Sequence, residues 1–284
     1  MRLVLSTAFA LIAFALNSIL CRLALRGEEA DAAAFTAVRL AAGAVVLGSI
    51  VVYSSGNGAS STREKVGGGS WMSALFLFTY AILFSLAYLN LTAGTGALIL
   101  FGSVQFTMIL ASLIRGERSR ALEWLGLAVA LAGLIYLFYP GLSSPPAASS
   151  ALMVAAGASW GLYTLRGKRS ADPIGETAGN FLKSLPFGAA ALLVFLPSLH
   201  LSAYGVLLAV ISGAVTSGIG YAVWYTALRD LTTTRAAVVQ LAVPIITAII
   251  GIVFLNEIAD LRLVIAGMLI LGGIALTVFG RREN

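Results

Sequence analysis

The chain has 284 residues, of which 59% are hydrophobic and only 11% are charged, and its formal net charge is +6. Soluble domains are about 45–50% apolar and about 25% charged, so this composition excludes a single water-soluble core. Most of the surface must therefore face lipid. Because the apolar runs are continuous and do not alternate with polar residues, they predict membrane-spanning helices rather than the strands of a barrel.

Ten apolar segments follow one another along the chain. They cover residues 3–24, 32–54, 71–91, 95–114, 121–140, 149–167, 176–197, 203–228, 234–255 and 260–280. Each approaches the length of about 20 residues that a helix needs to cross the hydrocarbon layer. The first segment is retained as a helix rather than a cleaved secretory signal, because Ile19 and Leu20 precede Cys21 where a cleavage site needs small residues.

Two glutamates indicate an internal repeat. Glu117 and Glu257 each follow a long apolar run and lie 140 positions apart, and the same offset pairs Thr107 with Thr247. An ungapped register over about fifty residues indicates duplication, although Ala, Leu and Gly also recur by chance in apolar sequences. The predicted units are residues 1–140 with helices 1 to 5, an outer linker at 141–148, and residues 149–284 with helices 6 to 10.

The positions of the cationic residues predict how the chain crosses the membrane. Most of the eighteen Lys and Arg residues lie near helix ends on the side of the N-terminus, which predicts that both termini are cytoplasmic. Because five helices per unit is an odd number, the second unit enters from the opposite side. Such inverted-topology repeats are typical of secondary transporters with a site near the bilayer midplane, the alternative being a structural repeat without transport.

The sequence gives no support for metal, cofactor or enzyme chemistry. Cys21 is the only cysteine, and the single histidine, His200, falls in a predicted outer turn. All carboxylates fall in loops or at helix ends, so no catalytic constellation is present and we expect no enzyme, no cofactor and no metal. The absence of an Asp or Glu near the bilayer midplane also favours a uniporter or weakly coupled exporter over a tightly coupled antiporter. No basic soluble domain is present to bind nucleic acid.

Aromatic residues in the middle of predicted helices are candidates for a cavity wall. Trp160 is the strongest, because it lies between Gly157 and Gly161, a small-xxx-small pair that allows close helix packing. The two halves align near their first helices, where Tyr163 corresponds to Asn17. Further candidates are Tyr80, Phe84 and Trp224. Each such aromatic either lines a cavity for an apolar solute or serves as packing bulk.

Helix 9 combines polar groups with a proline. Gln240, Pro244 and Thr247 share one helical face, and Pro244 removes the hydrogen bond to the carbonyl of Gln240. A polar backbone group freed in this way needs a partner or a wet cavity, which predicts a bend at the permeation path.

Two cations lie within predicted helices and are approximate counterparts in the two halves. Arg39 lies in helix 2 and Lys183 in helix 7. Each either extends to the nearer interface or has a role in gating or in pairing with a substrate carboxylate.

The duplicated five-helix unit, SWGLY in helix 6, the proline of helix 9 and the glutamates that end helices 4 and 9 together resemble the drug/metabolite transporter superfamily. Within it the chain looks like the EamA-type ten-helix exporters, and most like the bacterial aromatic amino acid exporters. The resemblance implies a central cavity lined by helices 1 to 4 and 6 to 9, with helices 5 and 10 peripheral, and ATP-independent efflux.

The sequence departs from the family pattern in two places. FALNS replaces the tryptophan-glycine expected in helix 1, and Val104-Gln105 stands where the first-half proline would be. The two halves are therefore not equivalent, and symmetry does not assign Phe14 or Val104 to the pore. Gln105 is expected to supply a polar contact instead.

We therefore expect a multi-pass secondary transporter of the inner (plasma) membrane. It would export small, net-neutral, partly apolar metabolites, aromatic or other amino acids above all, by alternating access. Efflux of drugs or lipophilic cations would favour a membrane-embedded carboxylate, and transport of sugar phosphates would favour convergent Arg or Lys residues.

Expected partners are the small-molecule substrate and the lipid bilayer, with the chain as monomer or homodimer. The candidate substrate-binding residues are Asn17, Tyr80, Phe84, Gln105, Trp160, Tyr163, Trp224, Gln240 and Pro244, with Arg39 and Lys183 as gating or charge candidates.

Overall fold

Helices make up almost all of the described backbone. The computed structural model describes residues 2–54, 68–114, 121–139, 141, 144–167, 170–228, 230–231, 239–258 and 260–280. Within these ranges the only β contact is an isolated bridge between Ala30 and Leu201. Glu117 and its neighbour Arg118 lie outside the described residues.

The helices follow the predicted segments closely. Those of the first half are α1 (Arg2–Arg26), α2 (Ala32–Ser54), α4 (Trp71–Tyr88), α5 (Ala93–Ile114) and α6 (Ala121–Phe138). Those of the second half are α7 (Ala147–Gly167), α8 (Pro173–Val194), η1 (Leu196–Ser198), α9 (Ala203–Ile211), η2 (Ser212–Ile219), α10 (Gly220–Leu228), α12 (Ala242–Leu255) and α13 (Leu261–Gly280). Apolar segment length therefore predicted most helix bounds to within a few residues; the predicted start of the ninth segment at residue 234 lies outside the described residues.

Two helices differ from the prediction in ways that the sequence explains. The helix predicted from residue 176 begins at Pro173, because the Asp172 side chain accepts a hydrogen bond from the Gly175 N–H at 3.1 Å and proline suits the first helical position. Val239 and Gln240 are helical, and Leu241 forms a turn before α12. Pro244 thus lies in the first turn of α12, where the missing N–H costs little, and the predicted bend is an interruption at Leu241.

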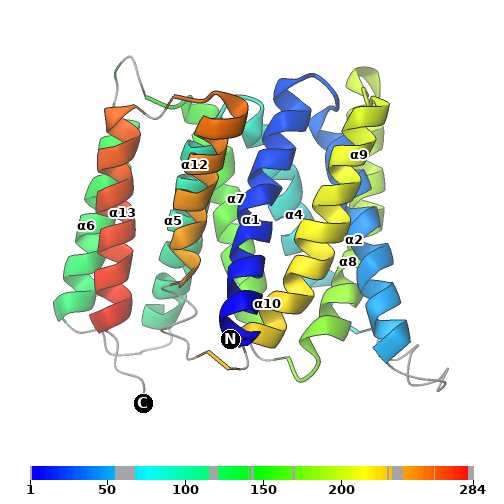
Figure 1. Ribbon diagram of the computed structural model, residues 1–284, viewed down its shortest axis with the longest axis horizontal. Coiled ribbons are helices and arrows are strands. Elements are labelled where there is room, and N and C mark those ends of the chain that lie inside the picture. The colour runs from blue at the N-terminus through cyan, green and yellow to red at the C-terminus, as the bar shows by residue number, and fades with distance from the viewer. Residues whose placement is uncertain are drawn as a thin grey trace.

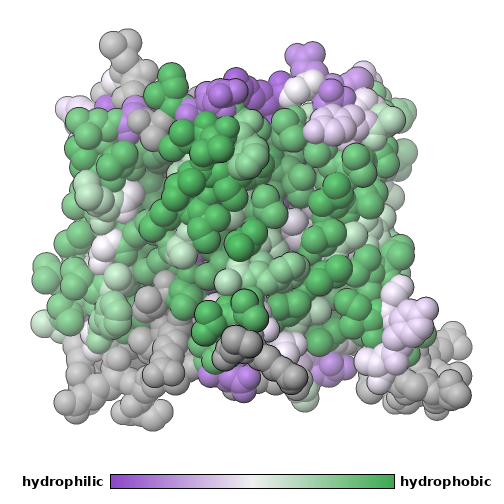
Figure 2. Space-filling view, in the orientation of Figure 1, coloured by the Kyte–Doolittle hydropathy of each residue, from purple (hydrophilic) through white to green (hydrophobic). Residues whose placement is uncertain are grey.

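The outer surface fits a lipid environment. Seven helical stretches in the described ranges are long and apolar enough to cross a membrane: Leu3–Arg26, Ala32–Ser54, Trp71–Tyr88, Ala93–Ala111, Ala121–Phe138, Ala203–Ala227 and Leu261–Gly280. An apolar band covers the middle of the molecule, and hydrophilic residues gather along its upper and lower edges (Figure 2). The protein is therefore a multi-pass helical membrane protein. The count of ten spans stays a prediction, because α7, α8 and the shorter α12 are not among the seven.

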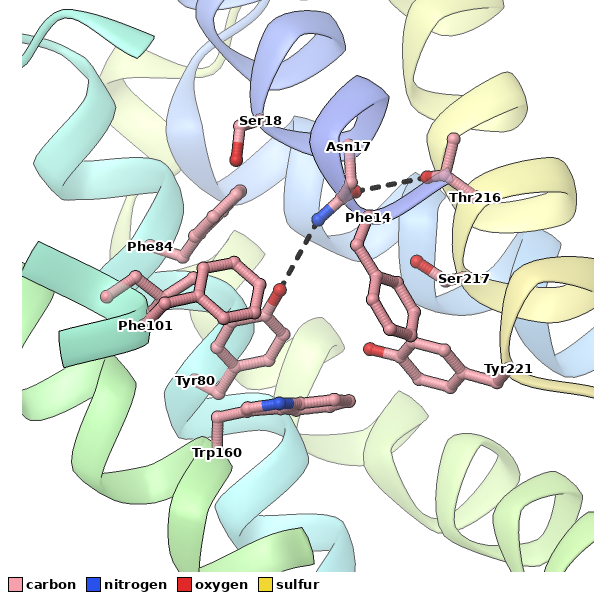
Figure 3. A pocket seen from close by; sticks show the side chains of 11 residues that line it. Phe14, Asn17, Ser18, Tyr80, Phe84, Phe101, Trp160, Thr216, Ser217 and Tyr221 are labelled. Carbon is pink, nitrogen blue, oxygen red and sulfur yellow. Dashed lines mark hydrogen bonds between the residues drawn. The ribbon is translucent and has the colours of Figure 1, made fainter. Parts of the chain in front are cut away.

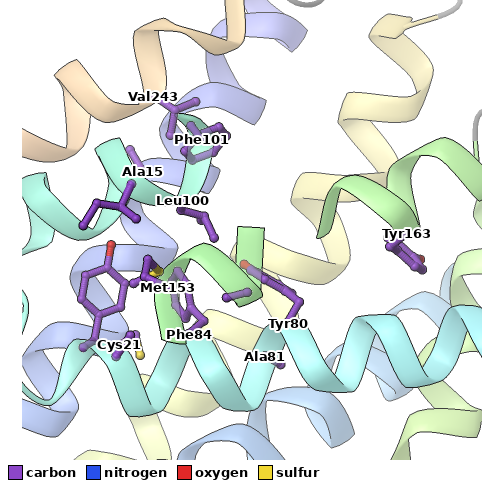
Figure 4. Close-up of a cluster of buried hydrophobic side chains, with 14 of the residues drawn as sticks. Ala15, Cys21, Tyr80, Ala81, Phe84, Leu100, Phe101, Met153, Tyr163 and Val243 are labelled. Carbon is purple, nitrogen blue, oxygen red and sulfur yellow. The ribbon is translucent and has the colours of Figure 1, made fainter. Parts of the chain in front are cut away.

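The beginning of α1 and the end of α13 lie at the same face of the bundle (Figure 1). We call this the terminal face and the other the opposite face. Helices of the first half pack on helices of the second: α2 on α8, α4 and α5 on α7, α5 on α12, and α1 on α10 and α12. A core of buried apolar side chains, including Phe84, Leu100 and Met153, joins these helices (Figure 4).

The α6 and α13 helices form a separate pair at one end of the bundle (Figure 1). Glycines bring them together, since a Cβ atom at Gly126 would lie 2.5 Å from the carbonyl oxygen of Gly273. These are the fifth and tenth predicted helices, which the family resemblance placed at the periphery. The space between the remaining helices holds the candidate site.

Candidate substrate cavity

A small cavity lies between the two halves, where α1, α4, α5 and α7 meet η2 and α10. Its lining residues are Phe14, Asn17, Ser18, Tyr80, Phe84, Leu100, Phe101, Trp160, Thr216, Ser217 and Tyr221. Its volume is about 20 Å³, which is room for about one water molecule. This conformation is therefore collapsed around the cavity, and helices must separate before a metabolite can enter.

Trp160 forms one wall of this cavity. Its indole lies below the rings of Tyr80 and Tyr221 in Figure 3, with ring centroids 4.8 Å and 5.1 Å away and ring planes tilted by 45° and 42°. The position follows from the small residues beside it: a Cβ at Gly157 would lie 2.6 Å from the Ser103 Cβ, and one at Gly161 would lie 3.0 Å from the Thr107 Cβ. The backbone of α7 can therefore approach α5 closely and direct the indole inward.

Phe14 contributes to the cavity wall even though helix 1 departs from the family pattern. Its ring meets those of Tyr221 and Trp224 edge to face, each at 5.8 Å between centroids. Phe84 packs against Tyr80 at 5.4 Å. Phe14 therefore lines the cavity, although symmetry between the two halves did not assign it to the pore.

A polar network forms the side of the cavity nearest α1. The amide nitrogen of Asn17 donates to the Tyr80 hydroxyl at 3.3 Å. The amide oxygen of Asn17 accepts from the hydroxyls of Ser212 at 2.7 Å and Thr216 at 3.3 Å. One buried amide thereby links α1, α4 and η2, and the bonds to Tyr80 and Thr216 are drawn in Figure 3.

Arg39 lies directly behind this network, with only 2% of its surface exposed. Its Nε donates to the Ser217 hydroxyl and its Nη2 to the Tyr80 hydroxyl, each at 3.2 Å. The guanidinium carbon lies 5.3 Å from the ring centroids of both Tyr80 and Phe84, within the range of a cation–π contact. Of the two alternatives for Arg39, extension to the interface is wrong.

Lys183 has a different position. Its Nζ donates to the backbone oxygens of Gly68 at 2.7 Å and Gly69 at 3.0 Å. Nearby, the side-chain oxygen of Asn180 accepts from the Ser70 N–H at 2.9 Å. Lys183 therefore anchors the segment that leads into α4 and does not line the cavity.

A larger opening of about 720 Å³ lies toward the terminal face. Its lining residues are Gly69, Ser70, Met72, Ser73, Phe76, Ala111, Leu162, Leu165, Arg166 and Glu176. We call it the vestibule. Phe76 is one helical turn from Tyr80, and Leu162 to Arg166 follow Trp160 within two turns. The rings of Tyr80 and Trp160 therefore separate the vestibule from the cavity.

An ion pair closes the opposite face. The Arg22 Nε lies 3.3 Å from Glu257 Oε1, and the Arg22 Nη1 donates to the backbone oxygens of Tyr88 at 2.8 Å and Leu89 at 3.1 Å. The second carboxylate oxygen of Glu257 accepts from the Ala93 N–H at 2.7 Å. A negative charge at the N-terminus of α5 is favourable there. Glu257 is thus a helix-end anchor.

Two further arginines bind backbone oxygens at this face. Arg262 lies close to Glu257 in the sequence, and its Nη1 donates to the Tyr139 backbone oxygen at 2.7 Å. Arg26 adds a second link from α1 to α12 by donating to the Leu255 oxygen at 2.7 Å.

Of the predicted site residues, Asn17, Tyr80, Phe84 and Trp160 meet at the cavity. Two more lie immediately behind them: Tyr163 stacks on Trp160 at 5.4 Å, and Trp224 touches Phe14. Three predicted residues, and Val104, do not line it. Gln105 is buried one turn beyond Phe101, Gln240 precedes the turn at Leu241, and Pro244 is buried in α12.

The prediction missed Thr216 and Ser217, which belong to η2. The sequence feature that could have identified them is SGAVTSGI, a group of small and hydroxyl residues inside an apolar run. It forms a π-helix, a widened form that is frequent at functional sites. Gly213 allows the close contact with α2, because a Cβ there would collide with the Arg39 backbone carbonyl.

Comparison with known proteins identifies the family of this chain. Residues 148–279 match the model of the EamA-like transporter family. A Pseudomonas aeruginosa protein without an assigned function is 47% identical over 280 residues, which are 99% of this chain and 96% of that one. The chain belongs to the EamA-like transporter family. This transporter is also 27% identical over 218 residues to a probable amino-acid metabolite efflux pump of Salmonella typhimurium, over 72% of this chain and 73% of the pump.

A solved crystal structure shares the fold of this EamA-like transporter, with a TM-score of 0.65 at 20% identity over 98% of this chain and 99% of that one. The family and the relatives with an assigned role are transporters and not enzymes. The cavity described above is therefore the candidate site of a carrier.

Proposed function

We propose that this protein exports small, partly apolar metabolites, with amino acids as the main class, from the cytoplasm across the inner (plasma) membrane. The observation that carries the proposal is the cavity lined by both aromatic and polar groups, which lies between an open vestibule and an ion-paired closure. The name of the Salmonella relative, an amino-acid metabolite efflux pump, supports the same substrate class.

The geometry fits alternating access. A solute would enter the vestibule and pass Trp160 and Tyr80 as their helices separate. It would then occupy the expanded cavity and leave when Arg22 parts from Glu257. With the terminal face in the cytoplasm, as the Lys and Arg distribution predicts, this direction is export. The vestibule then faces the compartment that holds the metabolite.

The lining favours some solutes over others. Aromatic rings offer apolar contact, and Asn17 together with the lining hydroxyls offers hydrogen bonds, which suits a solute with a polar head and an apolar body. A lipophilic cation is disfavoured, because no carboxylate lines the cavity and Arg39 places a positive charge beside it. Sugar phosphates would need several convergent cations, and Arg39 is the one cation that the described residues place in contact with this network.

Transport into proteoliposomes tests the proposal. The panel is labelled Phe, Trp, Tyr, Met and Thr, a sugar phosphate and a lipophilic cation, each with and without a pH gradient. We expect saturable transport of amino acids, strongest for the aromatic ones, and little dependence on the gradient. Transport of the lipophilic cation alone, or flux that follows the pH gradient stoichiometrically, would contradict this expectation.

A further inference from the structure

The charge of Arg39 has no anionic partner in the part of the chain that the structure describes. Both of its hydrogen bonds go to neutral hydroxyl oxygens, and its Nη1 is buried without any hydrogen-bond partner. Burying a cation without an anion is strongly unfavourable, and such a charge inside a membrane protein usually marks a substrate path. The fold therefore maintains a positive charge beside the cavity at a cost in stability.

The guanidinium presents the edge that suits a carboxylate. The Nε and Nη2 groups of an arginine can donate side by side to the two oxygens of one carboxylate. In this closed conformation the same two groups are bound by Ser217 and Tyr80, and both of these residues line the cavity. A carboxylate that enters the expanded cavity can replace the two hydroxyls as the acceptor of the hydrogen bonds from Nε and Nη2.

The two displaced hydroxyls can then donate to the same carboxylate. The Tyr80 oxygen already accepts from Arg39 and from Asn17, and among the described residues no acceptor is bound to its hydrogen. The Ser217 oxygen likewise accepts from Arg39. Up to four donors from α2, α4 and η2 therefore converge where a carboxylate would bind.

The same lining offers an ammonium group few hydrogen-bond acceptors and no negative charge. The one amide oxygen of the lining, from Asn17, already accepts from Ser212 and Thr216. The other lining groups are hydroxyls, an indole and apolar side chains, with no carboxylate among them. An ammonium would rest only against ring faces and hydroxyl oxygens, close to the like charge of Arg39.

We infer that Arg39 binds the carboxylate of the transported solute, and that the carboxylate, not the ammonium, is the group that the cavity selects. Organic monocarboxylates with an apolar body are then ligands even without an amino group, and their body packs on Phe84, Trp160 and Tyr221. The inference rests on the proposed function, because it assigns the ligand class of the same cavity.

Equilibrium binding to the full-length protein in lipid nanodiscs tests this inference. Three labelled probes share one phenyl ring: phenylalanine, 3-phenylpropionate without the ammonium, and phenethylamine without the carboxylate. We expect the two carboxylates to bind at least about tenfold more tightly than phenethylamine, since hydrogen bonds between charged groups are the strong ones. Phenethylamine binding as tightly as 3-phenylpropionate would overturn the inference and leave a transport function standing. Binding of none of the three would overturn both.

Variants of Arg39 provide a second test of the same inference. We expect Arg39→Gln to remove the preference for carboxylates and Arg39→Lys to keep part of it. The matched control is Lys183→Gln, which removes an intramembrane cation that does not line the cavity and should keep the preference. A folded Arg39→Gln protein that still prefers 3-phenylpropionate would overturn the inference. If Arg39→Gln does not fold, Arg39→Lys and the wild-type comparison of the three probes decide.

Discussion

Single residues determine the character of the cavity, and Trp160 and Arg39 contribute opposite properties. Trp160 supplies a broad apolar face, whereas Arg39 supplies a buried positive charge behind the hydroxyls of Tyr80 and Ser217. The sequence made Arg39 and Lys183 equivalent candidates. Only packing separates them, because one side chain turns inward while the other reaches the backbone of residues 68 and 69.

Replacing Trp160 tests its role as a cavity wall. We expect Trp160→Ala to lower transport of labelled tryptophan in proteoliposomes by about tenfold, since ring contacts of this kind contribute roughly 0.5–1.5 kcal/mol beyond the buried area. Protein level and membrane insertion should stay normal. The control is Trp124→Ala, because Trp124 is 54% exposed on the surface of α6. Unchanged flux through the Trp160 variant would remove this residue from the site.

At the scale of helices, close approach between α7 and α5 determines where Trp160 lies. We expect Gly157→Leu to force these helices apart, because its Cβ would meet the Ser103 Cβ at 2.6 Å and the Leu100 oxygen at 2.7 Å. Overpacking of this kind costs about 1–3 kcal/mol. Thermal unfolding in detergent and transport should both be impaired.

Gly48→Leu is the matched control, because nothing lies within 4 Å of a Cβ at Gly48. It places the same side chain on a membrane helix without a neighbour to displace. Equal losses in the two variants would show that leucine itself, and not the contact between α7 and α5, is harmful.

The link between α1 and α12 closes the opposite face. We expect Glu257→Gln to weaken it, because the ion pair with Arg22 and the charged cap of α5 are both lost. The readout is labelling of Ser18→Cys, in a Cys21→Ala background, by a membrane-impermeant maleimide added from that face. A loss of about 1 kcal/mol would raise labelling about fivefold. Labelling that stays at the wild-type level would exclude the ion pair as a closure.

Much of the helical layout follows from the sequence, because a membrane helix is determined by the length of its apolar run. The aromatic candidates Tyr80, Phe84 and Trp160 were found because bulky rings in mid-helix are conspicuous. Thr216 and Ser217 were missed for a physical reason. Their direction depends on the π-helical turn of η2, and a local change of hydrogen bonding leaves no trace in hydropathy.

At the scale of the whole molecule, the proposed function makes the open vestibule, the small cavity and the ion-paired opposite face one state of an alternating-access carrier. The vestibule at the terminal face has a volume of about 720 Å³, whereas the cavity beyond it has only about 20 Å³. A second state with the opposite face open is required for transport. A carrier that alternates between two such states can couple the outflow of unlabelled solute to the uptake of labelled solute, whereas a channel only lets both equilibrate.

Counterflow tests this central claim most directly. Proteoliposomes loaded with unlabelled phenylalanine are diluted into a trace of labelled phenylalanine, without a pH gradient. An alternating-access carrier should accumulate the label transiently above its equilibrium level, and the Trp160→Ala variant should do so much less. Accumulation no greater than in protein-free liposomes, with folded protein present, would contradict the account.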